Sequence, residues 1–362
     1  MLKILIVITS LGVGGAERLT TALADKYLEK GHEVKIAFLT GQAILTPKNK
    51  SVTVINLKVR SFCSLINSYF HLRRIMISYR PDVVHSHLVH ANLLTRLVRL
   101  STSFPKLISS SHSNNEGGKA RMLAYRATDF LADISTNVSD SAVSSFIKKG
   151  AARPGRMITV YNGISTEDFS FSSKARESIR EELGIEGKIP VILAVGRLDA
   201  PKDYPNLINA LSVIYNKKSY FKVLIAGDGP LKKELQALTK SLGLDNCITF
   251  LGIRNDIPNL MSACDVFSLS SAWEGFGLVV AEAMACERVV VATDCGGVAE
   301  VLGSTGFIVP PKNSIALAES LYAALALTDA QKAELGFRAR ERIKDKYSIE
   351  SVSEKWLSLY KV

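Results

Sequence analysis

The sequence WEGFGLVVAEAMA, residues 273–285, joins a glycine-rich turn to an apolar helix and carries two glutamates eight positions apart. Glu274 precedes the turn Gly275-Phe276-Gly277, and Glu282 lies about two helical turns further on, on roughly the same side. Such a turn leaves backbone N–H groups free at the helix N-terminus, where they bind anions. The pattern predicts a phosphate site between two carboxylates, one for sugar hydroxyls and one for a ribose. A glycine cap and a solvated glutamate would fit the spacing alone equally well.

Short β-branched apolar runs alternate with helical stretches along the whole chain. Near-continuous apolar strands separated by helices are typical of parallel sheets covered on both faces, and two such sets predict two doubly wound α/β domains. Ligands of such sheets bind beyond the carboxyl ends of the strands. The strands expected in the first half are Lys3–Ile8, Val34–Leu39, Val52–Asn56, Val83–His85, Lys106–Ser109, Asp133–Thr136 and Thr159–Tyr161. Those expected in the second half are Val191–Val195, Lys222–Ala226, Ile248–Leu251, Val266–Leu269, Val289–Ala292 and Phe307–Val309.

Composition and charge restrict the class of protein. The chain of 362 residues is 47% hydrophobic and 22% charged, which suits two globular domains, and no apolar run approaches the ~18 residues that span a bilayer. Of the net charge of +11, residues 1–180 carry +13 and the remainder −2. The basic half suggests an anionic lipid, a diphosphate-bearing acceptor or nucleic acid as its partner, although solvated surface charge would also account for it. No nucleic-acid module is recognisable, so we expect no nucleic-acid partner.

The cysteines are odd in number, scattered and without CxxC spacing, which predicts a reduced cytoplasmic compartment and no metal site. The opening MLKILIVITS is short and leads into glycines, so we interpret it as a buried strand rather than a secretory signal. The cysteines are Cys63, Cys247, Cys264, Cys286 and Cys295.

Further motifs surround the opening one: VGRLDAPKDY at 195–204, GDGP at 227–230, VVATDCGGVAEV at 290–301, GGAER at 14–18 and VYNGI at 160–164. Together they resemble the retaining glycosyltransferases of family 4, the group 1 glycosyltransferases of bacterial O-antigen, capsule and lipid-linked glycan assembly. The resemblance implies the GT-B fold, in which two Rossmann-like domains face a central cleft and the last helix crosses back to the first domain. It implies an acceptor-binding domain of residues 1–175 with the helix 345–362, and a nucleotide-sugar-binding domain of residues 186–344.

The resemblance also implies roles for individual residues. Arg197 and Lys202 would hold the donor diphosphate, and His112, after an apolar strand, would lie at the donor–acceptor junction. Glu274 would contact the sugar hydroxyls, and Glu282 would contact the ribose. His112, Arg197, Lys202 and Glu274 are thus the expected catalytic set. The remaining donor-binding residues would be Gly14, Gly15, Gly229, Arg254 at the nucleobase, Gly275, Phe276, Gly277 and Leu278.

Two basic or histidine-rich segments allow more than one interpretation. Residues 64–79 form an expected helix with an apolar stripe and nearby arginines, which could lie on an anionic membrane or be an ordinary domain helix. His85, His87 and His90 invite a metal interpretation, but no Cys or carboxylate accompanies them, so strand-end and helix-cap roles are favoured. As a dinucleotide fingerprint, the glycines at 12–15 fail, because Glu17 stands where Gly or Ala is needed.

We therefore expect a retaining hexosyltransferase that moves a hexose or N-acetylhexosamine from a nucleotide diphosphate sugar, UDP above all. The expected acceptor is a polyprenyl-diphosphate-linked or other oligosaccharide in cell-surface polysaccharide synthesis, and a soluble acceptor stays open. No cofactor or essential metal is expected. The expected location is cytoplasmic, peripheral to the inner face of the plasma membrane. A UDP-sugar epimerase and a non-enzymatic protein of the same architecture remain alternatives; a dehydrogenase is disfavoured.

Overall fold

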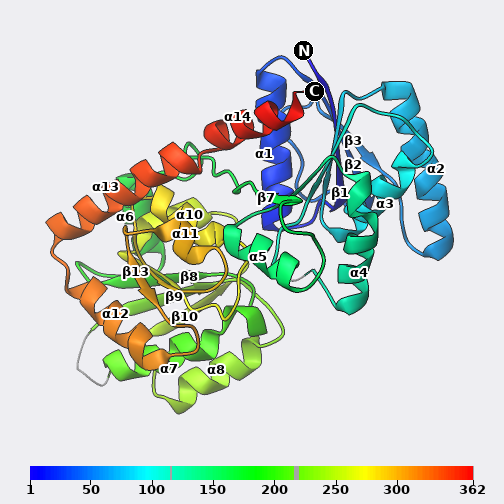
Figure 1. The fold of residues 1–362 in the computed structure, drawn as a ribbon. Coiled ribbons are helices and arrows are strands. Elements are labelled where there is room, and N and C mark those ends of the chain that lie inside the picture. Colours follow the sequence, from blue (N-terminus) through cyan, green and yellow to red (C-terminus); the bar gives the residue numbers. More distant parts are fainter. Residues whose placement is uncertain (115, 216–219, 362) are drawn as a thin grey trace. The chain divides into compact units, whose positions relative to one another are not determined.

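The computed structural model describes residues 1–114, 116–215 and 220–361, and of Phe62 and Cys63 it describes the backbone alone. The chain divides into two compact units. The first unit contains Met1–Gly163 together with Ile349–Val362, and the second contains Ile164–Ser348. Each unit is a parallel sheet with helices on both faces (Figure 1), which confirms the predicted fold class.

The first unit is built on a seven-stranded sheet with the order β3-β2-β1-β4-β5-β6-β7. Each predicted strand is found to within two residues at either end. The last lies at Met157–Thr159, two residues before its predicted position, because Thr159 pairs with Asn137 and Met157 is buried. The strands are β1 Lys3–Ser10, β2 Glu33–Thr40, β3 Thr53–Asn56, β4 Val83–His87, β5 Lys106–Ser110, β6 Ile134–Asn137 and β7 Met157–Thr159. The helices are α1 Gly15–Glu29, α2 Phe62–Tyr79, α3 Val89–Arg99, α4 Lys119–Thr128, η1 Asp129–Leu131, α5 Asp140–Lys148 and α14 Ile349–Tyr360.

The central strand β1 divides the core of the first unit into two layers. Ile4, Ile6 and Ile8 belong to the cluster that α1 and α14 cover, whereas Leu5 and Val7 belong to the cluster under α2 and α3. This alternation follows from the two-residue period of a strand, whose successive side chains point to opposite faces. In Figure 1, α1 and α14 accordingly lie on one side of this sheet and α2 and α3 on the other.

The C-terminal helix α14 is part of the first unit, as predicted, although it begins at Ile349 rather than near 345. Its apolar face is buried in the same cluster as α1, and Trp356 and Tyr360 are almost fully enclosed there. The Tyr360 hydroxyl is hydrogen-bonded to the Tyr27 hydroxyl at 3.0 Å. The helix is therefore a structural element of the first unit's core.

The second unit is built on a six-stranded sheet with the order β10-β9-β8-β11-β12-β13. All six predicted strands are found to within one residue. The strands are β8 Val191–Val195, β9 Lys222–Ala226, β10 Ile248–Gly252, β11 Val266–Leu269, β12 Val289–Thr293 and β13 Phe307–Val309. The helices are α6 Ser173–Glu182, η2 Ala200–Lys202, α7 Tyr204–Tyr215, α8 Lys232–Ser241, α9 Ile257–Ala263, α10 Leu278–Ala285, α11 Val298–Leu302, α12 Ser314–Ala326 and α13 Asp329–Lys346.

The division between the units differs from the predicted domain limits of 1–175 and 186–344. Residues 164–175 and 345–348 belong to the second unit. The Ile164 amide donates to the Tyr347 carbonyl at 2.7 Å, and the Arg340 guanidinium donates to the carbonyls of Thr166 and Phe169. These long-range contacts hold the connecting segment to α13.

Candidate functional site

An ion pair lies beyond the carboxyl end of β8 in the second unit. The Lys202 ammonium is 2.5 Å from Oε1 of Glu274, and Ser271 Oγ donates to the same oxygen at 2.8 Å. The Lys202 and Glu274 side chains are 20% and 16% exposed, so both retain access to solvent. The structure therefore brings together two of the predicted catalytic residues, which are 72 positions apart in sequence.

Backbone contacts fix Lys202 in place. Lys202 ends the short helix η2, and its carbonyl accepts from Ser270 Oγ at 2.8 Å. The amide of Ala272 donates to the Pro201 carbonyl at 2.8 Å, and the Tyr204 hydroxyl donates to the Gly196 carbonyl at 3.1 Å. The segment that carries Glu274 is thus tied directly to the segment that carries Lys202.

Two glycine turns pack against each other beside this pair. A Cβ atom at Gly227 would lie 1.9 Å from the Gly196 carbonyl oxygen, and one at Gly229 would lie 2.4 Å from the Leu198 carbonyl oxygen. The Gly227 amide in turn donates to the Gly252 carbonyl at 2.7 Å. Gly229, predicted to bind donor, therefore occupies a place where only glycine lets two backbones approach so closely.

The opening motif forms the turn and helix expected of it. Gly277 has φ +87° and precedes α10, and the Gly275 carbonyl accepts from the Gly297 amide at 3.2 Å. Phe276 is 3% exposed and packs edge-on against Tyr347 at 5.7 Å, so its side chain belongs to the core and only its backbone can meet a ligand. The N–H groups of a first helical turn, here from Leu278 onward, have no acceptor within their own helix.

Three other predicted donor residues have different environments. Glu282 lies within α10 and is 6% exposed, so it is a buried carboxylate rather than a solvated helix residue. The Arg197 side chain is 72% exposed and is 3.5 Å from Asp199. Arg254 makes hydrogen bonds to both Glu182 and Asp256, which raise the pKa of its guanidinium. Arg254 is therefore engaged with carboxylates of its own unit.

In the first unit, His112 follows β5 and meets His87, the last residue of β4. His112 Nε2 and His87 Nδ1 are 2.9 Å apart, so one ring donates to the other. Burial lowers the pKa of His112 to about 4, and it lowers the pKa of His87 well below its ordinary value. Both imidazoles are therefore neutral near pH 7. The buried atoms His112 Nδ1 and His87 Nε2 have no hydrogen-bond partner among the described residues.

Behind this pair, a third buried histidine connects it to the C-terminal helix. The rings of His85 and His87 are 4.0 Å apart, and those of His85 and Trp356 are 4.4 Å apart. His85 Nδ1 is 2.6 Å from the Tyr360 hydroxyl, and His85 Nε2 is 2.7 Å from Ser110 Oγ. His87 thus ends β4 as predicted, whereas His85 lies in the middle of the strand, and the contacts of these rings fix the position of His112.

Glu116 is a site residue that sequence reasoning missed. Its Oε1 accepts from the His112 amide at 2.9 Å, and its Oε2 accepts from the Tyr125 hydroxyl. Burial raises the pKa of this carboxyl. One signal could have revealed it: from residue 34 to Glu116, the only other acidic residue in the sequence is Asp82.

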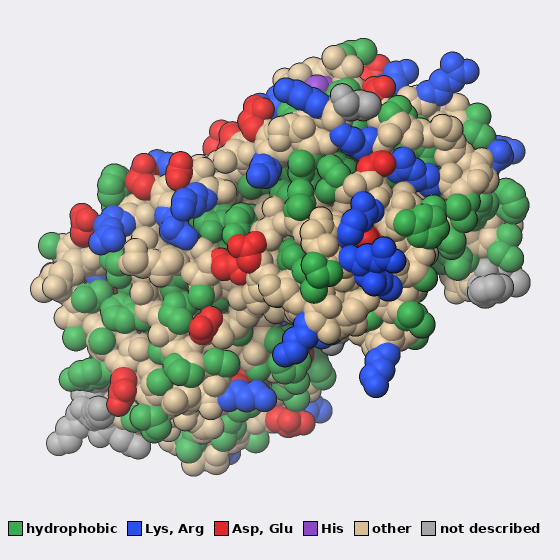
Figure 2. Space-filling view, in the orientation of Figure 1, with side chains coloured by type: hydrophobic (Ala, Val, Ile, Leu, Met, Phe, Trp, Pro, Cys, Tyr) green, Lys and Arg blue, Asp and Glu red, His purple; other side chains and the backbone are tan. Residues whose placement is uncertain are grey.

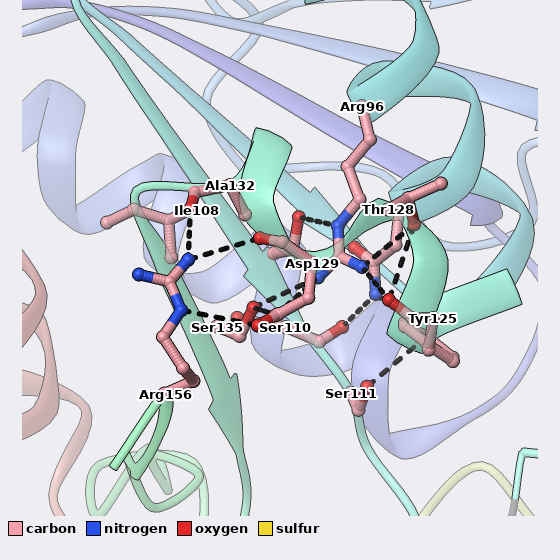
Figure 3. A network of polar contacts seen from close by, with 12 residues as sticks. Arg96, Ile108, Ser110, Ser111, Tyr125, Thr128, Asp129, Ala132, Ser135 and Arg156 are labelled. Atoms are coloured by element: carbon pink, nitrogen blue, oxygen red, sulfur yellow. Dashed lines mark hydrogen bonds and ion pairs between the residues drawn. The ribbon is translucent and has the colours of Figure 1, made fainter. Parts of the chain in front are cut away.

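Tyr125 belongs to a buried polar network that includes Arg96 and Asp129 (Figure 3). Arg96, 1% exposed, donates to the Tyr125 carbonyl at 3.2 Å and to Ser135 Oγ at 3.0 Å. Asp129 accepts from the same serine hydroxyl at 2.7 Å and from Arg156 at 3.3 Å. Buried charges require such partners. Here they anchor α4, whose Tyr125 hydroxyl donates to Glu116, and Glu116 in turn accepts from the His112 amide.

The glycine loop after β1 brings Gly14 to the N-terminus of α1. Gly14 caps the helix without a side chain, and a Cβ atom there would lie 2.4 Å from Glu17 Oε2. Glu17 Oε1 accepts from Ser10 Oγ at 3.0 Å. Gly14 and Gly15 thus expose backbone at the end of β1, with the Glu17 carboxylate folded against it.

No group of three His, Cys, Asp or Glu side chains that could hold a metal ion occurs within the described ranges. Cys247, Cys264, Cys286 and Cys295 are free and buried, which raises the pKa of each thiol, whereas the side chain of Cys63 lies outside the described residues. Where the structure describes the chain, none of its helices combines the length and apolarity that crossing a bilayer requires.

Two family models together match most of the chain. The model described as glycosyl transferases group 1 matches residues 175–342, and the model described as glycosyltransferase family 4 matches residues 13–168. The chain therefore belongs to the group 1 glycosyl transferases of glycosyltransferase family 4, and it is a glycosyltransferase.

Individual proteins agree with this assignment. The chain is 28% identical, over 99% of its length and 98% of the other, to the GalNAc-α-(1→4)-GalNAc-α-(1→3)-diNAcBac-PP-undecaprenol α-1,4-N-acetyl-D-galactosaminyltransferase of Campylobacter jejuni. A glycosyltransferase structure from Rickettsia africae matches with a TM-score of 0.88 at 21% identity, covering 99% of this chain and 98% of that one. Anabaena HepE in complex with UDP matches with a TM-score of 0.84 at 22% identity, covering 99% of both chains. These two structures support the GT-B fold.

Proposed function

We propose that this glycosyltransferase moves a hexose or N-acetylhexosamine from a UDP-sugar to a polyprenyl-diphosphate-linked saccharide, with retention of the anomeric configuration. The observation that carries the proposal is the Lys202–Glu274 pair, 2.5 Å apart and partly accessible at the carboxyl end of β8. The diphosphate-linked acceptor in the name of the Campylobacter relative and the UDP in the Anabaena complex support the choice of substrates.

The pair combines the two charges that a nucleotide sugar needs. As the glycosidic bond breaks, negative charge grows on the diphosphate, and a fixed cation such as Lys202 stabilises that charge. Glu274 accepts hydrogen bonds from sugar hydroxyls while it holds Lys202 in position. Arg197, exposed beside the pair, supplies a second cation with a guanidinium fork that suits phosphate oxygens.

The proposed transfer is a front-face substitution. The bond between the anomeric carbon and the β-phosphate oxygen breaks, and the acceptor hydroxyl oxygen bonds to the same face of that carbon. The hydroxyl proton passes to the departing diphosphate oxygen, so no side-chain nucleophile is required. His112 is neutral, and it would hydrogen-bond the transferred sugar or orient the acceptor rather than supply a positive charge.

The charge of the first unit supports an anionic acceptor. From Leu57 to Asn115 the sequence carries eight Lys and Arg but one carboxylate, Asp82. Peripheral binding at an anionic membrane surface, on the cytoplasmic side where nucleotide sugars are made, follows from the same imbalance, at about 1 kcal/mol per cation near the surface. The proposal requires neither a cofactor nor an essential metal.

The donor site is tested with Lys202→Met and Glu274→Gln. We expect each to weaken UDP-sugar binding at least tenfold and to slow UDP-sugar hydrolysis about 100-fold, because each removes a charge used in the transition state. The matched control is Lys232→Met, since Lys232 belongs to the same unit and pairs with Asp228 at the surface. Binding is followed by calorimetry over a panel of UDP- and GDP-sugars, and circular dichroism verifies folding.

Two outcomes would contradict the proposal. Unchanged donor affinity and hydrolysis in both site variants would refute the assignment of the pair. Interconversion of free UDP-sugars without acceptor, seen by proton NMR, would instead establish the epimerase alternative. Retention itself is read from the anomeric coupling constant of the disaccharide product.

A further inference from the structure

The first unit carries an exposed apolar groove between α2 and α3. It has a volume of about 530 Å³ and is lined mainly by Ile66, Tyr69 and Phe70 of α2 and by His90, Leu93 and Leu97 of α3. Ile66, Phe70 and Leu97 are 49%, 60% and 45% exposed, although each is large and apolar. Figure 2 shows hydrophobic side chains gathered over this part of the two helices. We call it the α2–α3 groove.

One end of the groove adjoins the histidine pair. The helix α3 begins at Val89, two residues after His87, whose ring is hydrogen-bonded to His112. His90 lies in the first turn of α3 and lines the groove. The groove therefore begins three residues after the histidine that contacts His112.

Positive charge lies at this end of the groove. Partial burial lowers the pKa of the His90 imidazole, and the positive charge of Arg121, exposed in α4, lowers it further. The helices α2, α3 and α4 carry no Asp or Glu. The single carboxylate between Leu57 and Asn114, Asp82, accepts a hydrogen bond from the Lys3 amide at 2.7 Å. Arg121 also donates to the Glu116 carbonyl at 3.2 Å and lies near the Glu116 carboxyl, so it is the one cation shown here that an anionic group at the His90 end would meet.

Three occupants of the groove can be compared: a second copy of the chain, a bilayer surface and a hydrocarbon chain joined to a phosphate group. A second copy of the chain would place the same cations opposite themselves across a two-fold axis, which like-charge repulsion disfavours. A bilayer surface would meet the exposed rim but would not explain a hollow of ligand size, in the range of about 300–1,000 Å³. A hydrocarbon chain joined to a phosphate group matches both the apolar lining and the adjacent Arg121.

We propose that the α2–α3 groove binds the isoprene units nearest the diphosphate of a polyprenyl-diphosphate-linked acceptor, with that diphosphate beside Arg121. This site rests on the proposed function, because the acceptor class comes from it. It adds a prediction about chain length: an acceptor with several isoprene units binds more tightly than one with a single unit, since each buried CH₂ group contributes to affinity.

The probes are farnesyl diphosphate, isopentenyl diphosphate and a diazirine-bearing farnesyl diphosphate. With the wild-type protein we expect farnesyl diphosphate to bind at least tenfold more tightly than isopentenyl diphosphate in calorimetry. After irradiation, peptide mass spectrometry should place the diazirine adducts on α2 and α3. Phosphatidylglycerol vesicles are added in competition, and displacement of the probe by phospholipid alone would show that acyl chains rather than isoprenoids are the ligand and would overturn the proposal.

The variant Ile66→Gln/Phe70→Gln should reduce the farnesyl-to-isopentenyl preference to less than threefold. Both side chains are about half exposed, so the substitutions should leave the fold intact. Phe130→Gln is the matched control, because Phe130 is 74% exposed in the same unit and does not line the groove. Arg121→Gln should weaken both diphosphates by a similar factor, several-fold, and leave the binding of uncharged farnesol unchanged.

The proposal fails if the adducts map outside α2 and α3, or if the double variant keeps the wild-type chain-length preference. It also fails if sedimentation shows a wild-type dimer that Phe70→Gln converts to a monomer, since a second copy would then cover the groove. UDP-sugar hydrolysis without acceptor is measured on the same samples. A groove variant that loses farnesyl diphosphate binding but retains UDP-sugar hydrolysis supports the lipid site. Absence of hydrolysis in the wild-type protein would contradict the proposed function, whereas the lipid-binding measurements would still test the groove by themselves.

Discussion

Lowering the pH from 7.5 to 5.0 should destabilise the first unit and spare the second. All six histidines of the chain lie between His32 and His112, so the second unit has none. His85, His87 and His112 are held neutral by burial, with pKa values lowered in the folded state. Below pH ~6.5 these histidines take up protons in the unfolded chain but not in the folded unit. The contribution of each histidine to the stability of the folded unit is therefore complete above pH ~6.5 and is lost as the pH falls.

The magnitude follows from the ordinary imidazole pKa of about 6.5. At pH 5.0, which is about 1.5 units lower, keeping one imidazole neutral costs about 2 kcal/mol, so three cost about 6 kcal/mol. The raised pKa of Glu116 acts in the opposite direction, because the folded unit takes up that proton more readily than the unfolded chain. We expect a net loss of about 4–6 kcal/mol, a large share of the ~5–15 kcal/mol of a typical domain.

The assay uses the single tryptophan of each unit. Trp356 is buried against His85 in the first unit, and Trp273 is half exposed in the second. In Trp273→Phe, urea unfolding followed by fluorescence reports the first unit, and its midpoint should fall by about 2 M between the two pH values, at an m of ~2–3 kcal/mol/M. In Trp356→Phe, the Trp273 transition should show no comparable shift.

An unchanged midpoint for the first unit between pH 7.5 and 5.0 would refute the reasoning, because it would mean that these imidazoles are already accessible to protons in the folded state. Glu116→Gln separates the opposing contribution. With that carboxyl removed, the acid-induced loss should grow, and a smaller loss would show that the sign assigned to Glu116 is wrong.

Two further changes test the packing around each half of the site. Tyr360→Phe should lower the free energy of unfolding of the first unit by about 2–4 kcal/mol, because His85 and Tyr27 each lose a buried hydrogen-bond partner. The measurement is a urea titration of Tyr360→Phe made in the Trp273→Phe protein. A loss under about 0.5 kcal/mol would contradict the prediction. Gly229→Ala should lower the free energy of unfolding of the second unit by about 1–3 kcal/mol and weaken UDP-sugar binding, because the new Cβ atom would collide with the Leu198 carbonyl. A variant with wild-type thermal stability would argue against that collision. The control is Gly118→Ala, whose Cβ atom meets open space.

The strands were predictable because both sheets are buried on both faces, so their sequences are near-continuous apolar runs. The motifs that contain Lys202 and Glu274 indicated that both residues serve the donor, but the ion pair between them is visible only in the structure. The limits of the units could not be predicted, since the contacts of Arg340 with Thr166 and Phe169 join segments about 170 residues apart, and no local pattern reveals them.

The remaining site residues depended on burial, which a motif does not specify. Phe276 was expected among the donor-binding residues, but its side chain faces the core. Arg254 was expected at the nucleobase, but it is hydrogen-bonded to Glu182, which lies 72 residues earlier. Glu116 follows no motif that we recognised. Its role becomes visible only when β5 and α4 bring it to the His112 amide.

The position of α14 in the core of the first unit has a consequence for synthesis on the ribosome. Residues up to Gly163 leave the exit tunnel before residues 164–348, but Trp356 and Tyr360, which complete their core, follow only after those residues. Throughout the intervening 185 codons, the nascent amino-terminal half exposes an apolar face that α14 has yet to cover, while the later half can already fold. The first unit therefore completes its core only after the second unit has been translated.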